Sequence, residues 1–245
     1  MRKYPIILLI LIFSIAMCAS QTNESSPQNA DNGLVSYAFE HLEEYRAAHS
    51  LAKMMRLRMS LLYPENADTA IAIVFPELMR YSEMRDSLEA LATRLLYSKD
   101  KDNRIYSIGH FQMKPTFAET IEREIAKNSE LKNRYRAIDY GGAKFTRKSR
   151  ALRIHRLRNI DTEIAYISAF IDICTKKLIT GLETPEERIK LLATAYNSGM
   201  DKTKQQLNRF MEQNSFPCGT MSKKSKWNYA QISADFFADV RPREE

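Results

Sequence analysis

TPEERIKLLATAYNSG, residues 184–199, carries a helix signal at each end. Thr184 can cap the N-terminus, Pro185 suits the first helical position, and the glutamate three residues after the cap completes a capping box. Gly199 provides a residue at which helices commonly end. We therefore predict an α-helix that begins at Pro185 and ends just before Gly199.

Helical patterns occupy most of the chain around this segment. Residues 34–63 carry apolar side chains at three-and-four spacing, which predicts one long amphipathic helix. Residues 162–179 are apolar on most faces and are expected to be central, with Asn159 or Asp161 as the N-cap. The other expected helices cover 69–75 after an Asp68 cap, roughly 84–97, 116 to about 135 after a Thr116–Glu119 capping box, 201–214 and 227–238. Strand signals are nearly absent, so the predicted fold class is all-α.

The first twenty residues, 1–20, have the form of an export signal. Basic residues precede an apolar run over 6–16 that is too short to span a bilayer, and small residues follow it. Lipidation of Cys18 ranks second, because Met17 stands where such signals carry a small residue. The protein is expected to be exported to the periplasm or cell envelope, with membrane attachment through Cys18 as an alternative.

Composition narrows the classes of partner. Removal of the leader lowers the formal net charge from +7 to about +5, a mildly basic balance that suits an anionic surface such as cell wall. Residues 21–33 are polar without apolar periodicity and are interpreted as a linker, which leaves 34–245 as one domain.

The segment 144–158 holds seven basic residues and no acid. A solvated basic segment is favoured over a binding patch, and without a nucleic-acid motif no nucleic acid is expected as a partner.

Two cysteines, Cys174 and Cys218, remain after removal of the leader. In an exported protein they can form one disulfide, which would join the central apolar helix to the loop before the last helix. Such a bond contributes about 3–4 kcal/mol on the chain-entropy model. Two free buried thiols are the alternative, since sequence spacing does not show whether the thiols meet.

The sequence lacks the motifs of several kinds of catalytic site. The chain has no phosphate-binding glycine loop and no clustered His/Cys set, and its four histidines are scattered. Neither a metal nor a cofactor is expected, and a mechanism based on carboxylates remains.

The stretch TAIAIVFPELMRYS, residues 69–82, places Glu77 directly after Pro76 and an apolar run. If a helix ends at Phe75, its negative end and the apolar neighbours disfavour the ionised carboxylate. Glu77 could then give a proton to a glycosidic oxygen. If Pro76 instead begins a new helix, the effect on Glu77 is reversed. The sequence leaves both interpretations open.

A second candidate stretch is YSIGHFQMKP, residues 106–115. Ser107 is a candidate ligand for substrate, Gly109 allows close approach of the backbone, and Gln112 places an amide among apolar neighbours. The alternative is a loop whose apolar side chains pack in the core.

The third candidate stretch, ATAYNSG (193–199), ends a helix with Tyr196 and Asn197. Adjacent residues lie about 100° apart around a helix, so these two side chains cannot share a face. We expect Tyr196 to face a cleft with its hydroxyl near Glu77, and Asn197 to hold a neighbouring turn. Tyr196→Phe is then expected to slow turnover at least about tenfold with little change in melting temperature. A half-buried Tyr196 with only a structural role is the alternative.

In their order along the chain, these three stretches resemble the lysozyme-like soluble lytic transglycosylases over roughly residues 66–200. The resemblance implies a lysozyme-like multi-helix domain that acts on peptidoglycan glycan strands. It makes Glu77 the catalytic acid. It implies a substrate cleft that contains Gln112, Tyr196, Asn197, Ser107 and Gly109. Three features depart from the family pattern: Leu78 replaces a serine, His110-Phe111 replaces Leu-Met, and residues 83–104 form an insertion between Glu77 and Gln112.

The reaction implied is cleavage of the β-1,4 bond between N-acetylmuramic acid and N-acetylglucosamine. Glu77 would protonate the leaving oxygen and then accept the proton of the muramyl 6-hydroxyl, which closes a 1,6-anhydro ring. Hydrolysis, the second choice, usually needs a second carboxylate, which the sequence does not identify. A non-catalytic peptidoglycan-binding or scaffold protein of the same fold is the alternative, favoured by Leu78.

Overall fold

The capping residues at both ends of 184–199 act as the sequence predicts. The Thr184 side chain accepts from the Glu187 amide, and the Glu187 carboxylate accepts from the Thr184 amide at 3.1 Å. Gly199 follows the helix with a φ of +114°, a conformation that other residues rarely adopt. The helix, α9 (Pro185–Ser198), therefore begins and ends at the predicted residues.

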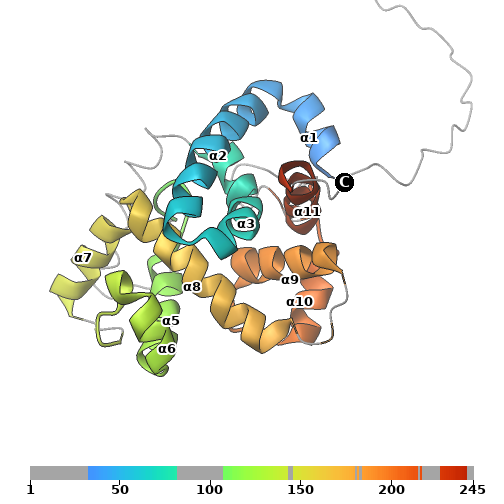
Figure 1. Cartoon of the computed structure of the whole chain (residues 1–245). Helices are drawn as coiled ribbons and strands as arrows, with labels where there is room; N and C mark the ends of the chain where they lie inside the picture. Colours follow the sequence, from blue (N-terminus) through green and yellow to red (C-terminus); the bar gives the residue numbers. More distant parts are fainter. Residues whose placement is uncertain are drawn as a thin grey trace, which may run out of the picture. The chain divides into compact units, whose positions relative to one another are not determined.

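The computed structural model describes residues 33–81, 107–142, 146–179, 181, 184–214, 216 and 227–241, all within the unit Asp31–Glu245. Figure 1 shows these segments as helices joined by connecting loops. The other elements are α1 (Leu34–Glu40), α2 (Leu42–Leu62), η1 (Pro64–Asn66), α3 (Ala67–Arg80), α5 (Pro115–Ala126), α6 (Ser129–Arg134), η3 (Arg136–Ile138), α7 (Arg147–Arg156), α8 (Ile160–Leu178), α10 (Lys204–Met211) and α11 (Tyr229–Val240). The described segments contain isolated β-bridges and no strand, so the all-α prediction is confirmed. None of the described helices is both long and apolar enough to cross a membrane.

Several predicted features lie outside the described residues. They are the export signal 1–20 with Cys18, the linker 21–33 except Gly33, the 83–104 insertion with its expected helix, and Cys218. Cys174 is buried in α8 and is a free thiol in the described part of the chain, while its predicted disulfide partner Cys218 lies outside the described residues, so the pairing stays a prediction. Burial raises the pKa of the Cys174 thiol to about 12, so it stays protonated and poorly nucleophilic at neutral pH.

Helix α8 is the central element of the described fold, as its sequence predicts. Residues 163–171 are all buried, and the helix contacts α2, α3, α5 and α9. Figure 1 shows it crossing the fold diagonally between the α5–α7 region and α9. Its N-cap is Asn159, whose side chain accepts from the Thr162 amide. Asp161 instead binds Arg58 of α2, with 2.7 Å between Oδ2 and Nη2.

The long helix predicted over 34–63 is two helices, because His41 interrupts it with a φ of −132° and a ψ of 54°. The break allows α1 to pack on α11. The Leu34 amide donates to Asp235 at 2.8 Å, and the Tyr37 ring centroid lies 5.4 Å from that of Trp227. Apolar spacing alone predicts one continuous helix, since these contacts come from the other end of the chain.

Two predicted N-caps are wrong because each helix begins before the predicted capping residue: α3 begins at Ala67 and α5 begins at Pro115. Asp68 lies in the first turn of α3 and pairs with Arg56 of α2 at 2.6 Å. Glu119 of α5 accepts from Arg153 of α7 at 3.0 Å, and α5 has no side-chain cap, so the capping box with Thr116 is not formed. The single helix expected here is also divided, into α5 and α6.

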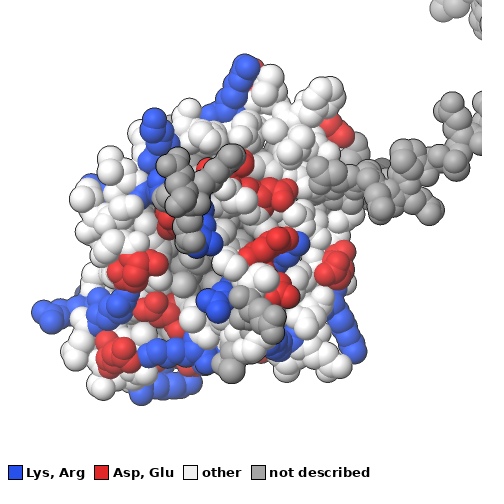
Figure 2. Space-filling view, turned by 45° about the vertical axis from the view of Figure 1, so that its right-hand side comes forward, with Lys and Arg blue, Asp and Glu red and all other residues white. Residues whose placement is uncertain are grey.

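The basic segment 144–158 is only partly solvated, which corrects the favoured interpretation of it. Arg153 is 1% exposed and donates to both oxygens of Glu122, at 2.9 and 2.6 Å. Tyr166 of α8 donates to the same carboxylate at 2.6 Å. Arg153 of α7, Glu122 of α5 and Tyr166 of α8 therefore form a buried charged cluster that joins the three helices. On the face shown in Figure 2, Lys and Arg side chains are interspersed with Asp and Glu.

Candidate functional site

Glu77 lies in the last turn of α3, a helix that Pro76 does not interrupt. Both sequence interpretations are therefore wrong, since the helix neither ends at Phe75 nor begins at Pro76. The proline removes one N–H from the helix, but packing against α2 and α11 holds α3 together. In one of these contacts the Tyr229 hydroxyl of α11 donates to the Ile73 carbonyl at 2.9 Å. Glu77 still lies near the C-terminal end of a helix, as the first interpretation expected.

The Glu77 carboxylate is almost enclosed. The residue is 6% exposed, and its apolar neighbours Phe75 and Leu78 are buried, as the sequence suggests. Arg80, one turn later, places Nη1 3.3 Å from Glu77 Oε2, and its guanidinium lies 5.8 Å from the centroid of the Phe216 ring. The three-residue spacing was the sequence signal for this pair. Glu77 is therefore a carboxylate held against a cation at the end of a helix.

The loop at 108–113 is a tight turn closed by its own backbone. Ile108 and Met113 exchange two N–H···O bonds of 2.9 Å. Gln112 has a φ of +50°, and its side-chain amide donates to the Gly109 carbonyl at 2.9 Å. The amide of Gln112 is thus held in a fixed position by the turn that carries it.

Gly109 is required by a close approach between this turn and α8. A Cβ built on Gly109 would lie 2.1 Å from Oε1 of Glu163 and 2.2 Å from the Leu157 carbonyl oxygen, and its φ is +79°. Glu163 is fully buried, accepts from the Phe111 amide at 3.0 Å, and lies 3.1 Å from His110 Nδ1. Burial raises the pKa of Glu163, while the bonds from His110 and Phe111 oppose that shift.

Sequence reasoning predicted close backbone approach at Gly109 and missed Glu163, the residue that is approached. The available signal was an acidic side chain inside an α8 segment that is otherwise apolar on most faces. Buried carboxylates are found where several donors converge, and here the donors come from one turn. Glu163 therefore positions the loop that carries Gln112.

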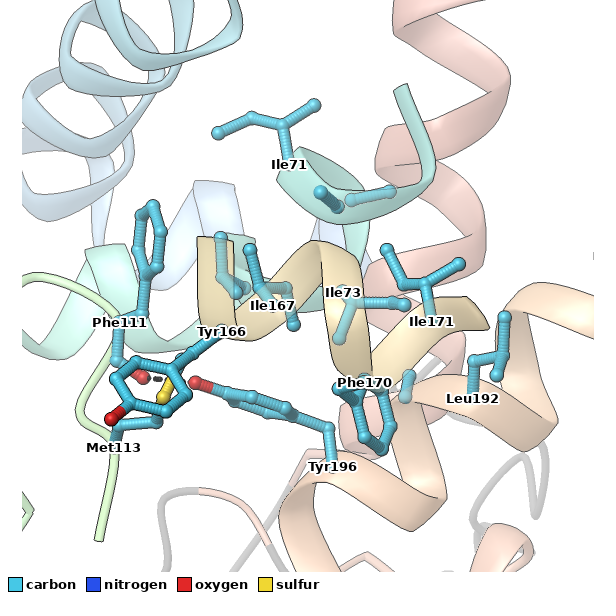
Figure 3. Close-up of a cluster of buried hydrophobic side chains, with 14 of the residues drawn as sticks. Ile71, Ile73, Phe111, Met113, Tyr166, Ile167, Phe170, Ile171, Leu192 and Tyr196 are labelled. Atoms are coloured by element: carbon cyan, nitrogen blue, oxygen red, sulfur yellow. Dashed lines mark hydrogen bonds between the residues drawn. The ribbon is translucent and has the colours of Figure 1, made fainter. Parts of the chain in front are cut away.

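Tyr196 is mostly a core residue. Figure 3 shows it reaching from α9 toward Phe111, and its hydroxyl donates to the Phe111 carbonyl at 2.6 Å. Its ring meets Phe117 and Phe170 edge to face, with centroids 5.2 and 5.6 Å away. Burial, and then the charges of Glu77 and Glu163, raise the pKa of Tyr196 well above its usual value. The hydroxyl proton of Tyr196 is therefore donated to the Phe111 carbonyl. This corrects the expectation that the hydroxyl acts on Glu77 directly.

Tyr196→Phe is expected to lower the free energy of unfolding by about 1–3 kcal/mol, because the buried Phe111 carbonyl loses its donor. This revises the expectation of an unchanged melting temperature. Tyr140→Phe is a matched control, since the Tyr140 hydroxyl donates to the Ala137 carbonyl at an exposed site. The control should change stability by less than about 0.5 kcal/mol. Equal denaturation midpoints for both variants would show that the Phe111 bond contributes nothing.

A pocket of about 450 Å³ gathers the predicted site residues from three separate stretches of the chain. Its lining includes Glu77 from α3, Gln112 from the loop and Ser107 directly before it, and Tyr196 and Asn197 from α9. Gly109 is not part of the lining and acts from behind, by letting the loop approach α8. Sequence positions up to 120 residues apart are thus brought to one cavity.

The same pocket contains charged residues that sequence reasoning did not identify. They are Arg80, Lys114, Arg123 and the exposed carboxylate Asp201, which follows Gly199 by two positions. Among the residues that the structure describes, no group of three or more His, Cys, Asp or Glu side chains could hold a metal ion. The groups available at the pocket are therefore carboxylates, cations, amides and hydroxyls.

Comparison with known proteins adds no relative: no family model, no curated protein and no solved structure matches this chain.

Proposed function

We propose that this chain is an exported enzyme that cleaves the β-1,4 bond between N-acetylmuramic acid and N-acetylglucosamine in peptidoglycan, with Glu77 as the acid. The observation that carries the proposal is the shared pocket of Glu77, Gln112, Tyr196 and Asn197. All four residues belong to the three motifs whose order along the chain resembles that of the lytic transglycosylases. A volume of about 450 Å³ also lies within the range of pockets that enclose small ligands.

The proposed chemistry uses one carboxylate in two steps. Glu77 gives a proton to the glycosidic oxygen as the bond to the muramyl C1 breaks, and N-acetylglucosamine leaves. The Glu77 carboxylate then accepts the proton of the muramyl 6-hydroxyl while that oxygen bonds to C1. The acid is regenerated, no water is consumed, and the product carries a 1,6-anhydro ring.

Hydrolysis is the second form of the same proposal, and Asp201 gives it a candidate. An inverting hydrolase uses a second carboxylate to activate water on the opposite side of the sugar ring. Asp201 lines the pocket from the segment after α9, whereas Glu77 comes from α3.

A non-catalytic peptidoglycan-binding protein is the second candidate function, and the ion pair between Glu77 and Arg80 favours it. A carboxylate 3.3 Å from a guanidinium is stabilised in its ionised form by the opposite charge. A proton donor has to spend part of its cycle protonated. In the catalytic proposal, bound substrate has to separate Arg80 from Glu77; in the binding proposal the pair persists.

Mass spectrometry of sacculi digested with the purified protein tests the proposal. Soluble fragments that end in 1,6-anhydro-N-acetylmuramic acid are expected. Fragments with ordinary reducing ends would replace the transglycosylase form by the hydrolytic one. Protein that pellets with sacculi and releases no fragment would support the binding function.

A further inference from the structure

One wall of the pocket is a single face of α5. Thr116, Phe117, Thr120 and Arg123 all line the pocket, and Lys114 precedes the first residue of the helix. Their three-and-four spacing places them on one side of the helix. The opposite side of α5 carries Ile121, Ile125 and other buried residues. The wall therefore has a fixed orientation toward the cavity, with a cation at each end.

The two cations of this wall are not neutralised by acids of the described chain. Arg123 donates from Nη2 to Thr120 Oγ1 at 2.8 Å, which orients the guanidinium, and neither Arg123 nor Lys114 makes an ion pair within the described residues. Lys127 and Lys177, which do not line the pocket, both bind Glu124. These two lysines are thus paired, while the two cations of the α5 wall remain available to a ligand.

The remaining charges of the lining do not cancel this excess. Glu77 is paired with Arg80, and Asp201 comes from the segment after α9. Lys114 and Arg123 therefore make the α5 wall of the pocket positive, while the two acids and Arg80 come from other elements. A guanidinium and an ammonium in the lining of a cavity favour a ligand with carboxylates, through charge-assisted hydrogen bonds.

We propose that Lys114 and Arg123 bind carboxylates carried by the glycan strand, namely those of the peptides attached through the lactyl groups of the muramic acids. The proposal rests on the proposed function, because it places a peptidoglycan strand in the pocket. It makes the α5 wall the part of the site that distinguishes acidic strands from neutral ones. The sugar-cleaving groups, Glu77 and its neighbours, lie on other elements.

The test measures binding of soluble peptidoglycan fragments in two forms, native and with the carboxylates converted to amides. The non-cleaving Glu77→Gln variant serves as the parent, so that the fragments remain intact. The Kd for native fragments is expected to rise at least about tenfold when Lys114→Met and Arg123→Gln are added. The Kd for amidated fragments is expected to stay within about twofold. High salt should weaken the native complex and leave the amidated one unchanged.

A charge-matched control is available outside the pocket. Lys132 and Arg136 are exposed and do not line it, so Lys132→Met with Arg136→Gln removes the same charge from the molecule. If the control weakens binding as much as the pocket pair, only net charge matters and the proposal fails. Equal affinity of the parent for native and amidated fragments, or no binding of either, also overturns it. Cleavage of sacculi by the wild type is scored separately, so failure of the α5 subsite does not imply failure of the proposed function.

Discussion

Glu77→Gln is expected to lower the release of soluble fragments from sacculi at least about 10³-fold, which corresponds to about 4 kcal/mol in the barrier. Glutamine keeps the size of the side chain and can still form a hydrogen bond, but its amide N–H is far too weak an acid to protonate the leaving oxygen. The rate is measured with the purified wild type and variant on the same preparation of sacculi. Circular dichroism checks that the helices of both proteins are equally formed.

Two further variants make this result specific. Glu43→Gln removes an exposed carboxylate of α2 that pairs with Arg46 of the same helix, and should leave the rate unchanged. Asp201→Asn should have little effect on a transglycosylase and a large effect on an inverting hydrolase. Wild-type rates in Glu77→Gln would remove Glu77 from the role of acid. Fragment release by neither wild type nor variant, with sacculus binding retained in both, would favour the binding function.

The parts of the fold that sequence predicted correctly depend on contacts within one helix. Thr184, Glu187 and Gly199 interact with residues one turn away, so α9 could be assigned from end to end. The central position of α8 followed from apolar residues on most of its faces. In both cases the information lies in a single short window.

The failures share a different physical origin. Asp68 and the Thr116–Glu119 pair have local sequence patterns typical of helix N-termini, yet Asp68 and Glu119 are each bound by an arginine from another helix. Glu119 and Arg153 are 34 residues apart, so no local sequence pattern predicts that they pair. The helices begin at Ala67 and Pro115, which places Asp68 and Thr116 inside them, where a side chain cannot act as the N-cap.

The sequence predicted the residues that line the candidate site, but not the residue that holds its loop in place. Glu77, Gln112, Tyr196 and Asn197 could be chosen because each belongs to a short motif, and the order of the motifs carried the resemblance. Glu163 belongs to none of these motifs. Its partner Phe111 is 52 residues away, and its role is visible only when α8 is seen against the loop.

Gly109→Ala is expected to lower the free energy of unfolding by at least about 3 kcal/mol. A φ of +79° costs alanine about 1 kcal/mol relative to glycine. The larger part comes from a methyl group that would lie 2.2 Å from the Leu157 carbonyl oxygen and 2.1 Å from Glu163 Oε1. The backbone oxygen at the end of α7 cannot rotate away, and Glu163 cannot move without losing the Phe111 amide. Urea denaturation of the purified protein gives the measurement.

Gly141→Ala separates the two contributions, because Gly141 has a φ of +66° and nothing within 4 Å of a built Cβ. The free energy of unfolding of this control should fall by about 1 kcal/mol, which is the conformational contribution alone. A similar loss for Gly109→Ala would mean that the loop shifts freely and that the contact with Glu163 is unimportant.

If the loop cannot shift without cost, Gly109→Ala should also displace residues that line the pocket. Glu163 holds the amide of Phe111, and Tyr196 donates to the carbonyl of the same residue, so a loop displaced from α8 also loses its bond to α9. Gln112, whose side chain is fixed to the Gly109 carbonyl, must move with it. Glu163→Gln keeps an acceptor for the Phe111 amide and leaves Gly109 unchanged, so it should retain far more fragment release than Gly109→Ala at equal fractions of folded protein. The reverse order would mean that the charge of Glu163, and not the position of the loop, is what the pocket requires.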